Sequence, residues 1–350
     1  MRRDRAYLDW NATTPLRPEA RAAMIAAMDV AGNPSSVHAE GRAAKALVER
    51  ARGQIAEALG AMAADIVFVS GSTEAAALAL EGRDLLCSGV EHDAVRAWCR
   101  EDLSVDGCGK VQMPADPGGC TLQLANSETG VIQDLPQGLA VSDLTQGFGK
   151  MPLGFDWMGI DMGFISAHKL GGPKGIGALV LRRGLDVTAR IKGGGQEMGR
   201  RSGTENVIGI MGFGAAAQAA QRDLADGVWE KVFELRKILE SGLASENTST
   251  IFVGKDSARL PNTSMIATPG WKGETQVMQM DLAGFAISAG SACSSGKVKA
   301  SHVLTAMGYD EETAASAIRV SLGPETNEDQ VLRFVEAWSA QNRRRLARAS

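Results

Sequence analysis

The feature of this sequence that most constrains its fold is an alternation between short apolar runs and longer amphipathic segments. Residues 66–70, 139–142, 163–166 and 178–181 are short and mostly apolar, as buried strands are. Residues 42–59 instead repeat apolar side chains at helical spacing. Such alternation is typical of a mostly parallel sheet covered by helices, so we expect an α/β fold.

The pattern changes after about residue 247. Short strand-like runs at 251–253 and 264–267 precede a helical segment that begins near residue 327. This mixture predicts a second, smaller α+β domain. We therefore expect three parts: an N-terminal segment (1–12), a large domain (13–247) and a small C-terminal domain (248–350).

Composition is that of an ordinary globular protein, with 350 residues, 44% hydrophobic and 22% charged. The net charge of -4 and the lack of a basic stripe argue against direct binding of nucleic acid. Residues 1–9 are rich in charge and no apolar stretch follows them, which argues against a secretory signal peptide. Residues 206–221 carry no charge, but their glycines and glutamines favour a buried helix over a membrane span.

The five cysteines do not form a recognisable framework. Their number is odd and no Cys-x-x-Cys occurs, which argues against paired disulfides. The four histidines are scattered, so a structural zinc site is not expected. The cytoplasm is the expected compartment.

Two segments combine a predicted strand end with residues that bind anions or cations. Residues 70–74, Ser-Gly-Ser-Thr-Glu, lie between a strand and a helix, where backbone N–H groups and the helix dipole favour an anion. An ordinary helix N-cap is an equal alternative. Asp143 follows the strand at 139–142, where ligands bind in open α/β sheets. Taken alone, Asp143 with Gln146 three residues later resembles a capping box.

Two further segments carry reactive side chains. Lys169 follows a predicted strand and precedes a glycine-rich turn, a place where a lysine of lowered pKa forms a Schiff base. The turn lacks the Gly-Lys-Ser/Thr of a nucleotide-binding loop. Cys293 lies among the small residues of 288–296, which predicts an accessible thiol on a loop. Cys87, in an apolar run, is expected to be structural.

Together these segments resemble the cysteine desulfurases, which belong to the class V aminotransferase group of fold-type-I pyridoxal-phosphate enzymes. The resemblance covers nearly the whole chain. Four more segments share it: Tyr-Leu-Asp at 7–9, Gly-Asn-Pro-Ser-Ser-Val-His at 32–38, Gly-Gly-Gly-Gln-Glu at 193–197 and Arg-Val-Ser-Leu-Gly at 319–323.

The resemblance implies a bound pyridoxal 5'-phosphate. Lys169 would be its Schiff-base lysine, and Asp143 would pair with the pyridinium nitrogen. Gln146 would bond the phenolic oxygen, and His92 would stack on the ring and move protons. The residues that would hold the phosphate are Thr73, Ser166 and His168, joined by Thr204 from the neighbouring subunit of a homodimer.

The resemblance also implies the substrate and the reaction. L-cysteine would be held through its carboxylate by Arg319, with help from Asn33. Lys169 would remove the α-proton, and Cys293 would accept the sulfur as a persulfide while alanine leaves. A sulfur-acceptor or scaffold protein would take the sulfur for iron–sulfur cluster assembly or tRNA thiolation. From the residues alone, His92 and Arg319 could equally be ordinary polar side chains.

Two departures from the family pattern and three alternative functions remain open. Family members usually carry two asparagines where this chain has Asn126 and Ser127, so either residue could contact the cofactor. Residues 80–120 are shorter than usual, which predicts a trimmed helix or strand. The alternatives are a selenocysteine lyase, another lyase or aminotransferase of the same family, and a catalytically silent scaffold for sulfur carriers.

Overall fold

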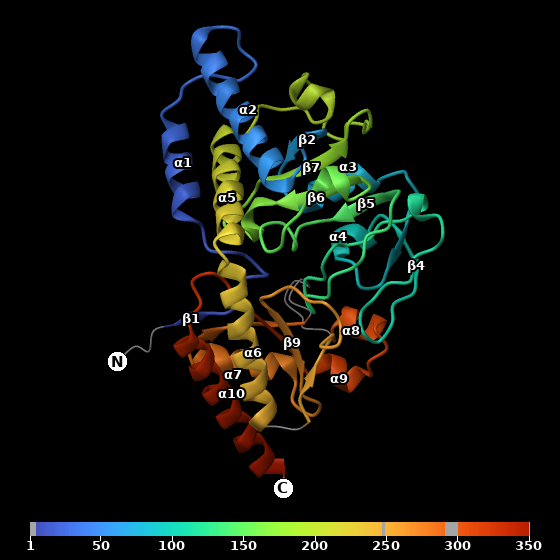
Figure 1. Cartoon of the computed structure of the whole chain (residues 1–350), viewed down its shortest axis with the longest axis vertical. Coiled ribbons are helices and arrows are strands. Elements are labelled where there is room, and N and C mark those ends of the chain that lie inside the picture. The colour runs from blue at the N-terminus through green and yellow to red at the C-terminus, as the bar shows by residue number, and fades with distance from the viewer. Residues whose placement is uncertain (1–4, 247–248, 291–299, 350) are drawn as a thin grey trace.

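A computed structural model of the chain describes residues 5–246, 249–290 and 300–349 (Figure 1). A four-stranded sheet forms the upper part of the molecule. Its strands, in spatial order, are β2 (Ala64–Val69), β7 (Gly177–Arg182), β6 (Ile160–Ser166) and β5 (Leu139–Asp143). β5 and β6 are parallel, whereas β7 is antiparallel to both of its neighbours.

Further parallel pairings extend this sheet beyond β5. Thr121 bridges to Val141 of β5, and the adjacent Cys120 bridges to Leu86 of β3 (Leu86–Ser88). β3 in turn pairs in parallel with β4 (Arg100–Leu103). The mostly parallel sheet predicted from the sequence is therefore confirmed, with β7 as its antiparallel member.

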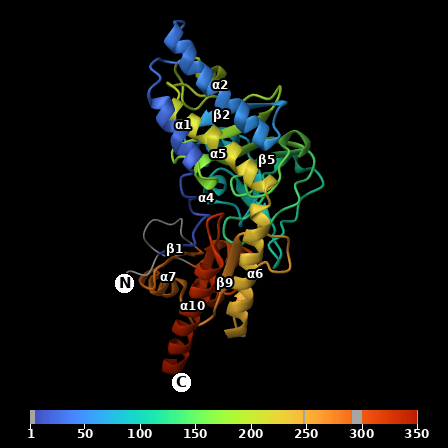
Figure 2. The same ribbon diagram turned by 60° about the vertical axis from the view of Figure 1, so that its left-hand side comes forward.

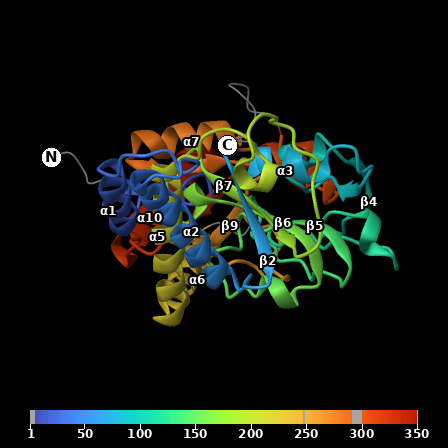
Figure 3. The same ribbon diagram turned by 90° about the horizontal axis from the view of Figure 1, so that it is seen from above.

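Helices cover both faces of the sheet because side chains alternate along each strand. Ile66 and Phe68 of β2 pack into one apolar cluster, whereas Val67 and Val69 pack into another. The first cluster includes residues of α2 (Ala39–Leu59) and α5 (Val207–Ala225), with α1 (Pro18–Met28) beside them, and the second includes α3 (Ser72–Leu80). In the view from above, α2 and α3 lie to either side of β6 and β7 (Figure 3).

A second, antiparallel sheet lies in the lower part of the molecule. Its strands, in spatial order, are β11 (Ser288–Ala289), β12 (Ala317–Ser321), β9 (Thr263–Ala267) and β8 (Ile251–Phe252). The N-terminal β1 (Ala6–Tyr7) pairs with β10 (Phe285–Ala286) beside it. The helices of this part are α6 (Val228–Glu246), α7 (Gly273–Leu282), α8 (His302–Ala306), α9 (Glu311–Ala315) and α10 (Glu328–Ala349).

Helix α6 packs with the lower part of the chain. Its Trp229 and Val232 belong to the same apolar cluster as Ile318 of β12 and Trp338 of α10. Helices α5 and α6 follow one another along the molecule and join its two parts (Figure 2). The division after residue 247 stays a prediction, and this packing favours a boundary nearer to Gly227, between the two helices.

Residues 80–120 contain little regular structure. Apart from β3, β4 and the end of α3, they hold the four-residue α4 (Asp93–Arg96) and the 3-10 turn η1 (Pro117–Gly119). None of the helices in the described ranges is both long and apolar enough to cross a bilayer.

Candidate active site

The carboxyl ends of β5 and β6, the first turn of α3 and the edge of the lower sheet surround a cavity of about 860 Å³. The topology explains this, because side chains that follow parallel neighbouring strands meet at one edge of a sheet. Of the residues predicted from the sequence, the cavity is lined by Thr73, His92, Ser127, Asp143, Gln146, Ser166, His168, Lys169 and Arg319.

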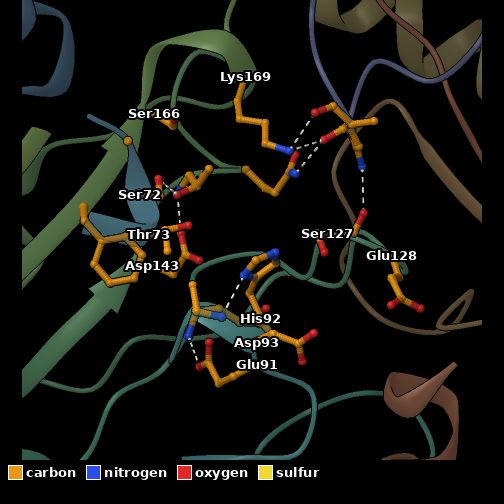
Figure 4. A pocket seen from close by; sticks show the side chains of 18 of the residues that line it. Ser72, Thr73, Glu91, His92, Asp93, Ser127, Glu128, Asp143, Ser166 and Lys169 are labelled. Carbon is orange, nitrogen blue, oxygen red and sulfur yellow. Dashed lines mark hydrogen bonds between the residues drawn. The ribbon is translucent and has the colours of Figure 1, made fainter. Parts of the chain in front are cut away.

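Lys169 ends a 3-10 turn directly after β6. Two residues later, Gly171 has φ +91°, a conformation that favours glycine. Its Nζ donates hydrogen bonds to the main-chain oxygens of Asn11 at 2.7 Å and Ala12 at 3.0 Å. The side chain points into the cavity, toward the space that the ring of His92 also faces (Figure 4). Both of these acceptors are neutral carbonyl oxygens, and the amine can leave them in order to react.

Asp143 is the last residue of β5. Its Oδ1 accepts a hydrogen bond from the backbone N–H of Thr145 at 2.8 Å. Burial raises the pKa of its carboxyl, against the opposing effect of this bond and of nearby His92 and Lys169. A capping box is wrong here, because the Gln146 side chain bonds elsewhere: its Nε2 donates to the main-chain oxygen of Asn11 at 3.0 Å.

His92 forms the N-cap of α4. Its Nδ1 accepts a hydrogen bond from the backbone N–H of Ala94 at 3.0 Å, so the proton of the neutral ring lies on Nε2. The adjacent Glu91 is fully buried, and its Oε1 accepts from the backbone N–H of Gln123 at 2.6 Å. Burial and the nearby Asp143 raise the pKa of Glu91 well above its ordinary value.

The first turn of α3 offers backbone N–H groups to the cavity. Ser72 and Thr73 both line it, and the Ser72 hydroxyl lies 2.7 Å from that of Thr145 (Figure 4). Glu74 secures the turn, because its Oε2 accepts from the Ser70 N–H at 2.7 Å and its Oε1 pairs with Arg201 at 2.8 Å. This end of the cavity suits an anion.

His168 also lines the cavity. Its Nδ1 is 3.2 Å from the hydroxyl of Thr13. Burial and the positive charges of Lys169, Lys174 and Lys150 lower its pKa to about 4. The imidazole is therefore neutral near neutral pH and can donate one hydrogen bond.

Arg319 brings a buried cation from β12 of the lower sheet. Its side chain pairs with Asp9 at 2.8 Å and donates to the main-chain oxygen of Ser127 at 3.0 Å. Its buried Nε has no hydrogen-bond partner within the described part of the chain. Arg319 also lines the cavity, and a guanidinium there is suited to a carboxylate ligand.

Ser127 lines the cavity, whereas Asn126 does not. The Asn126 side chain is buried and shapes the loop: its Nδ2 donates to the Val90 oxygen at 2.9 Å, and its Oδ1 accepts from the backbone N–H groups of Glu128 and Thr129. Of the two, Ser127 is therefore the one placed to meet a ligand.

Three predicted residues are not brought to this cavity by the described chain. Asn33 is exposed and its Oδ1 accepts from the Ser35 N–H at 2.9 Å. Thr204 is also exposed and does not line the cavity. Cys293 lies outside the described residues, although Gly290 and Ala300, on either side of that gap, line the cavity.

Sequence reasoning missed several residues that the fold brings together. Glu128 lines the cavity, its Oε2 accepts from the Ser301 hydroxyl at 2.6 Å, and burial raises its pKa to about 7. Asn11, which also lines the cavity, and Lys150, which does not, both hydrogen bond to Gln146. Only the position of Asn11 close to the Tyr-Leu-Asp motif at 7–9 could have drawn attention to it.

Comparison with known proteins agrees with this geometry. The profile of the aminotransferase class-V family matches residues 6–104 and 116–334. A cysteine desulfurase of Cereibacter sphaeroides is 38% identical over 370 residues, covering 95% of this chain and 94% of the relative. Cysteine desulfurase 2 of Trichormus variabilis is 39% identical over 359 residues, covering 93% of this chain and 90% of the relative.

A solved structure is similar over the same extent. The NifS-like protein of Rickettsia africae superposes with a TM-score of 0.87 and 34% identity, covering 96% of this chain and 99% of its own. Residues 105–115, which the family profile leaves unmatched, fall within the short 80–120 segment. The profile match and the full-length relatives agree: this chain is a member of the aminotransferase class-V family.

Proposed function

We propose that this protein is a cysteine desulfurase, which converts L-cysteine to L-alanine and keeps the sulfur as a persulfide on Cys293. The observation that carries the proposal is one cavity that combines Lys169 after β6, Asp143 after β5 and the buried Arg319 of β12. The relatives named cysteine desulfurase support the same activity.

The donor set of the cavity fits pyridoxal 5'-phosphate. The first turn of α3, with Thr73, and the side chains of Ser166 and His168 would hold the phosphate at the end of the cavity that suits an anion. The carboxylate of Asp143 would pair with the ring nitrogen, and that cation would oppose the effect of burial on its pKa. Gln146 and Ser127 would hydrogen bond the ring substituents. Bound there, the cofactor would stabilise negative charge at the substrate Cα.

Arg319 would bind the substrate carboxylate through its guanidinium, which orients the α-carbon toward Lys169. Lys169, as a neutral amine, would accept the α-proton. His92, whose Nε2 carries the proton of the neutral ring, would hydrogen bond within the cavity and return protons to the substrate.

Cys293, as a thiolate, would attack the sulfur of the bound cysteine. An S–S bond forms, and the bond between sulfur and Cβ breaks with its electron pair left on the carbon side. Protonation of that carbon and of Cα completes alanine, and the persulfide stays on the protein. The sulfur then passes to an acceptor protein by thiol exchange, for iron–sulfur cluster assembly or tRNA thiolation.

The assembly and the compartment belong to the same proposal. We infer a homodimer, in which the exposed Thr204 of one subunit would reach the phosphate of the other. A reduced cytoplasm suits the reactive thiol and the unpaired cysteines Cys87, Cys99, Cys108 and Cys120.

The decisive experiment supplies the cofactor-loaded protein with L-cysteine and measures alanine, with and without a thiol reductant. We expect one alanine per sulfide released when reductant is present, and about one alanine per active site when it is absent. Pyruvate as the product would indicate a lyase that eliminates the sulfur. No turnover, despite bound cofactor, would indicate a silent scaffold.

A further inference from the structure

Lys150 is a buried lysine that the reaction described above does not use. Its side chain lies in the turn after β5, and the residue is only 3% exposed. Burial lowers the pKa of its amine well below the ordinary value, and the nearby charges of Lys169 and Arg319 lower it further. An amine in such surroundings is costly unless hydrogen bonds satisfy it.

Two side-chain oxygens provide those bonds. The Nζ of Lys150 donates to the Oε1 of Gln146 at 2.6 Å and to the Oδ1 of Asn11 at 2.9 Å. The amide of Gln146 is placed in one orientation, with Oε1 toward Lys150 and Nε2 toward the main-chain oxygen of Asn11, which can only accept. Flipping the amide would turn its NH₂ group toward the amine of Lys150.

This orientation reaches the reactive lysine. The Nε2 of Gln146 donates to the main-chain oxygen of Asn11 at 3.0 Å, and that oxygen also accepts from the Nζ of Lys169 at 2.7 Å. Lys150, Gln146, Asn11 and Lys169 thus form one chain of hydrogen bonds. Gln146 and Lys169 line the cavity, whereas Lys150 does not.

Asn11 connects the same chain to the lower sheet. Its Oδ1 accepts from the Nδ2 of Asn262 at 3.0 Å as well as from Lys150, and its Nδ2 donates to the hydroxyl of Thr263 at 2.9 Å and to the Ser127 oxygen at 3.1 Å. The side chain of Asn11 is therefore also fixed in one orientation. A donor at position 150 completes a fully bonded buried network.

We propose that Lys150 is a positioning residue, which fixes the amide of Gln146 and the carbonyl of Asn11 in the orientation in which Gln146 and Lys169 meet the cofactor. This inference rests on the proposal that the cavity binds pyridoxal 5'-phosphate. Lys150 acts through Gln146, since it does not itself reach the cavity.

Lys150→Met tests the role with little change of shape, since methionine keeps the apolar stem and loses the amine. The oxygen of Gln146 would lose its donor, and the bond from its Nε2 to Asn11 alone would hold the amide. The fold should tolerate the change, because the variant also removes a buried amine and its desolvation cost. We therefore expect weaker cofactor binding with little change in the melting temperature of the cofactor-free protein.

A double-mutant cycle separates positioning from a general effect on the fold. Pyridoxal 5'-phosphate is titrated into the cofactor-free forms of the wild type, K150M, Gln146→Leu and the double variant, and the dissociation constant is read from the visible absorbance. We expect each single variant to weaken binding about tenfold, as the loss of one or two buried hydrogen bonds does. The double variant should bind no more weakly than Q146L alone.

The control is Lys110→Met. It removes a lysine that pairs with the exposed Asp134 and does not line the cavity, so this variant should bind the cofactor as the wild type does. Unchanged binding by K150M, or single effects that multiply in the double variant, would overturn the inference. If K150M does not fold, Lys150→Leu, which also lacks the amine, replaces it in the same cycle with the same criterion. A wild type that binds no cofactor would instead refute the proposed function.

Discussion

The amine of Lys169 lies 2.7 Å from the main-chain oxygen of Asn11, a residue 158 positions away in the sequence. Asn11 itself is bonded to Asn262 and Thr263, at the start of β9. The lysine after β6 is therefore held by a segment anchored in the lower sheet. Any shift between the two parts of the molecule would move the carbonyls that hold this amine.

Lys169→Ala should abolish covalent attachment of pyridoxal 5'-phosphate, because Lys169 is the lysine at the carboxyl end of β6 whose amine enters the cavity. The visible band of the purified protein should disappear after dialysis. Added cofactor should still bind reversibly through its phosphate, at the end of the cavity that suits an anion. A dialysis-resistant band like that of the wild type would assign the attachment to another lysine, such as Lys174.

Glu128→Gln should change how stability depends on pH. The pKa of this buried carboxyl is raised from 4.5 to about 7, mainly by burial, while Ser301, Arg319 and His92 oppose the rise and Asp93 adds to it. Between these pH values the folded protein holds a proton that the unfolded chain has released. Stability is therefore lost as the pH rises from about 4.5 to about 7, by on the order of 3 kcal/mol in full.

Glutamine cannot ionise and still offers an oxygen to the Ser301 hydroxyl, so the variant escapes this loss. As the pH rises from 5 to 8, the melting temperature of cofactor-free Glu128→Gln should increase relative to that of the cofactor-free wild type. The exposed Glu230→Gln serves as the matched control and should follow the wild type. A difference that does not vary with pH would show that Glu128 ionises normally.

Local sequence signals predict the elements that build the site. The strands that end at Ser166 and Asp143 are recognisable as short apolar runs, and the parallel arrangement that their alternation with helices implies places their ends together. The residues alone place Lys169 and Asp143 at strand ends, and the family resemblance assigns both to one cofactor site. The capping-box interpretation of Asp143 and Gln146 is wrong because a tertiary contact, to Asn11, takes the glutamine side chain.

Buried charges cannot be predicted in the same way. Glu91, Glu128 and Lys150 are charged residue types that are usually exposed, and nothing in their neighbouring sequence marks them as buried. Their burial results from segments far apart in the sequence, such as Ser301 against Glu128 and Asn11 against Lys150. Asn33 shows the converse, because its motif is recognisable while its side chain lies on the surface.

Thr204 provides a test of the dimer. It is exposed in the single chain and does not line the cavity of its own subunit. If it completes the phosphate site of a partner, Thr204→Ala should weaken cofactor binding about tenfold through loss of a hydrogen bond to a charged group. Sedimentation at micromolar concentration should show a dimer in both proteins, and a fully active monomer would refute the shared site.

Cys293→Ser gives the sharpest test of the chemistry. The variant should keep the cofactor band and should still bind L-cysteine, because Lys169 and Arg319 are unchanged. It should form neither a protein persulfide nor alanine at an appreciable rate, since a serine hydroxyl is far less ionised than a thiol near neutral pH.

The other cysteines supply the controls for this test. Serine at the exposed Cys108 should leave turnover intact, and serine at the buried Cys87 or Cys120 should affect stability more than turnover. Mass spectrometry after brief reaction with L-cysteine should place one additional sulfur on the peptide that contains Cys293. An additional sulfur on Cys87, Cys99, Cys108 or Cys120 would move the acceptor to that residue. Alanine formed at the wild-type rate by Cys293→Ser would rule out the persulfide mechanism itself.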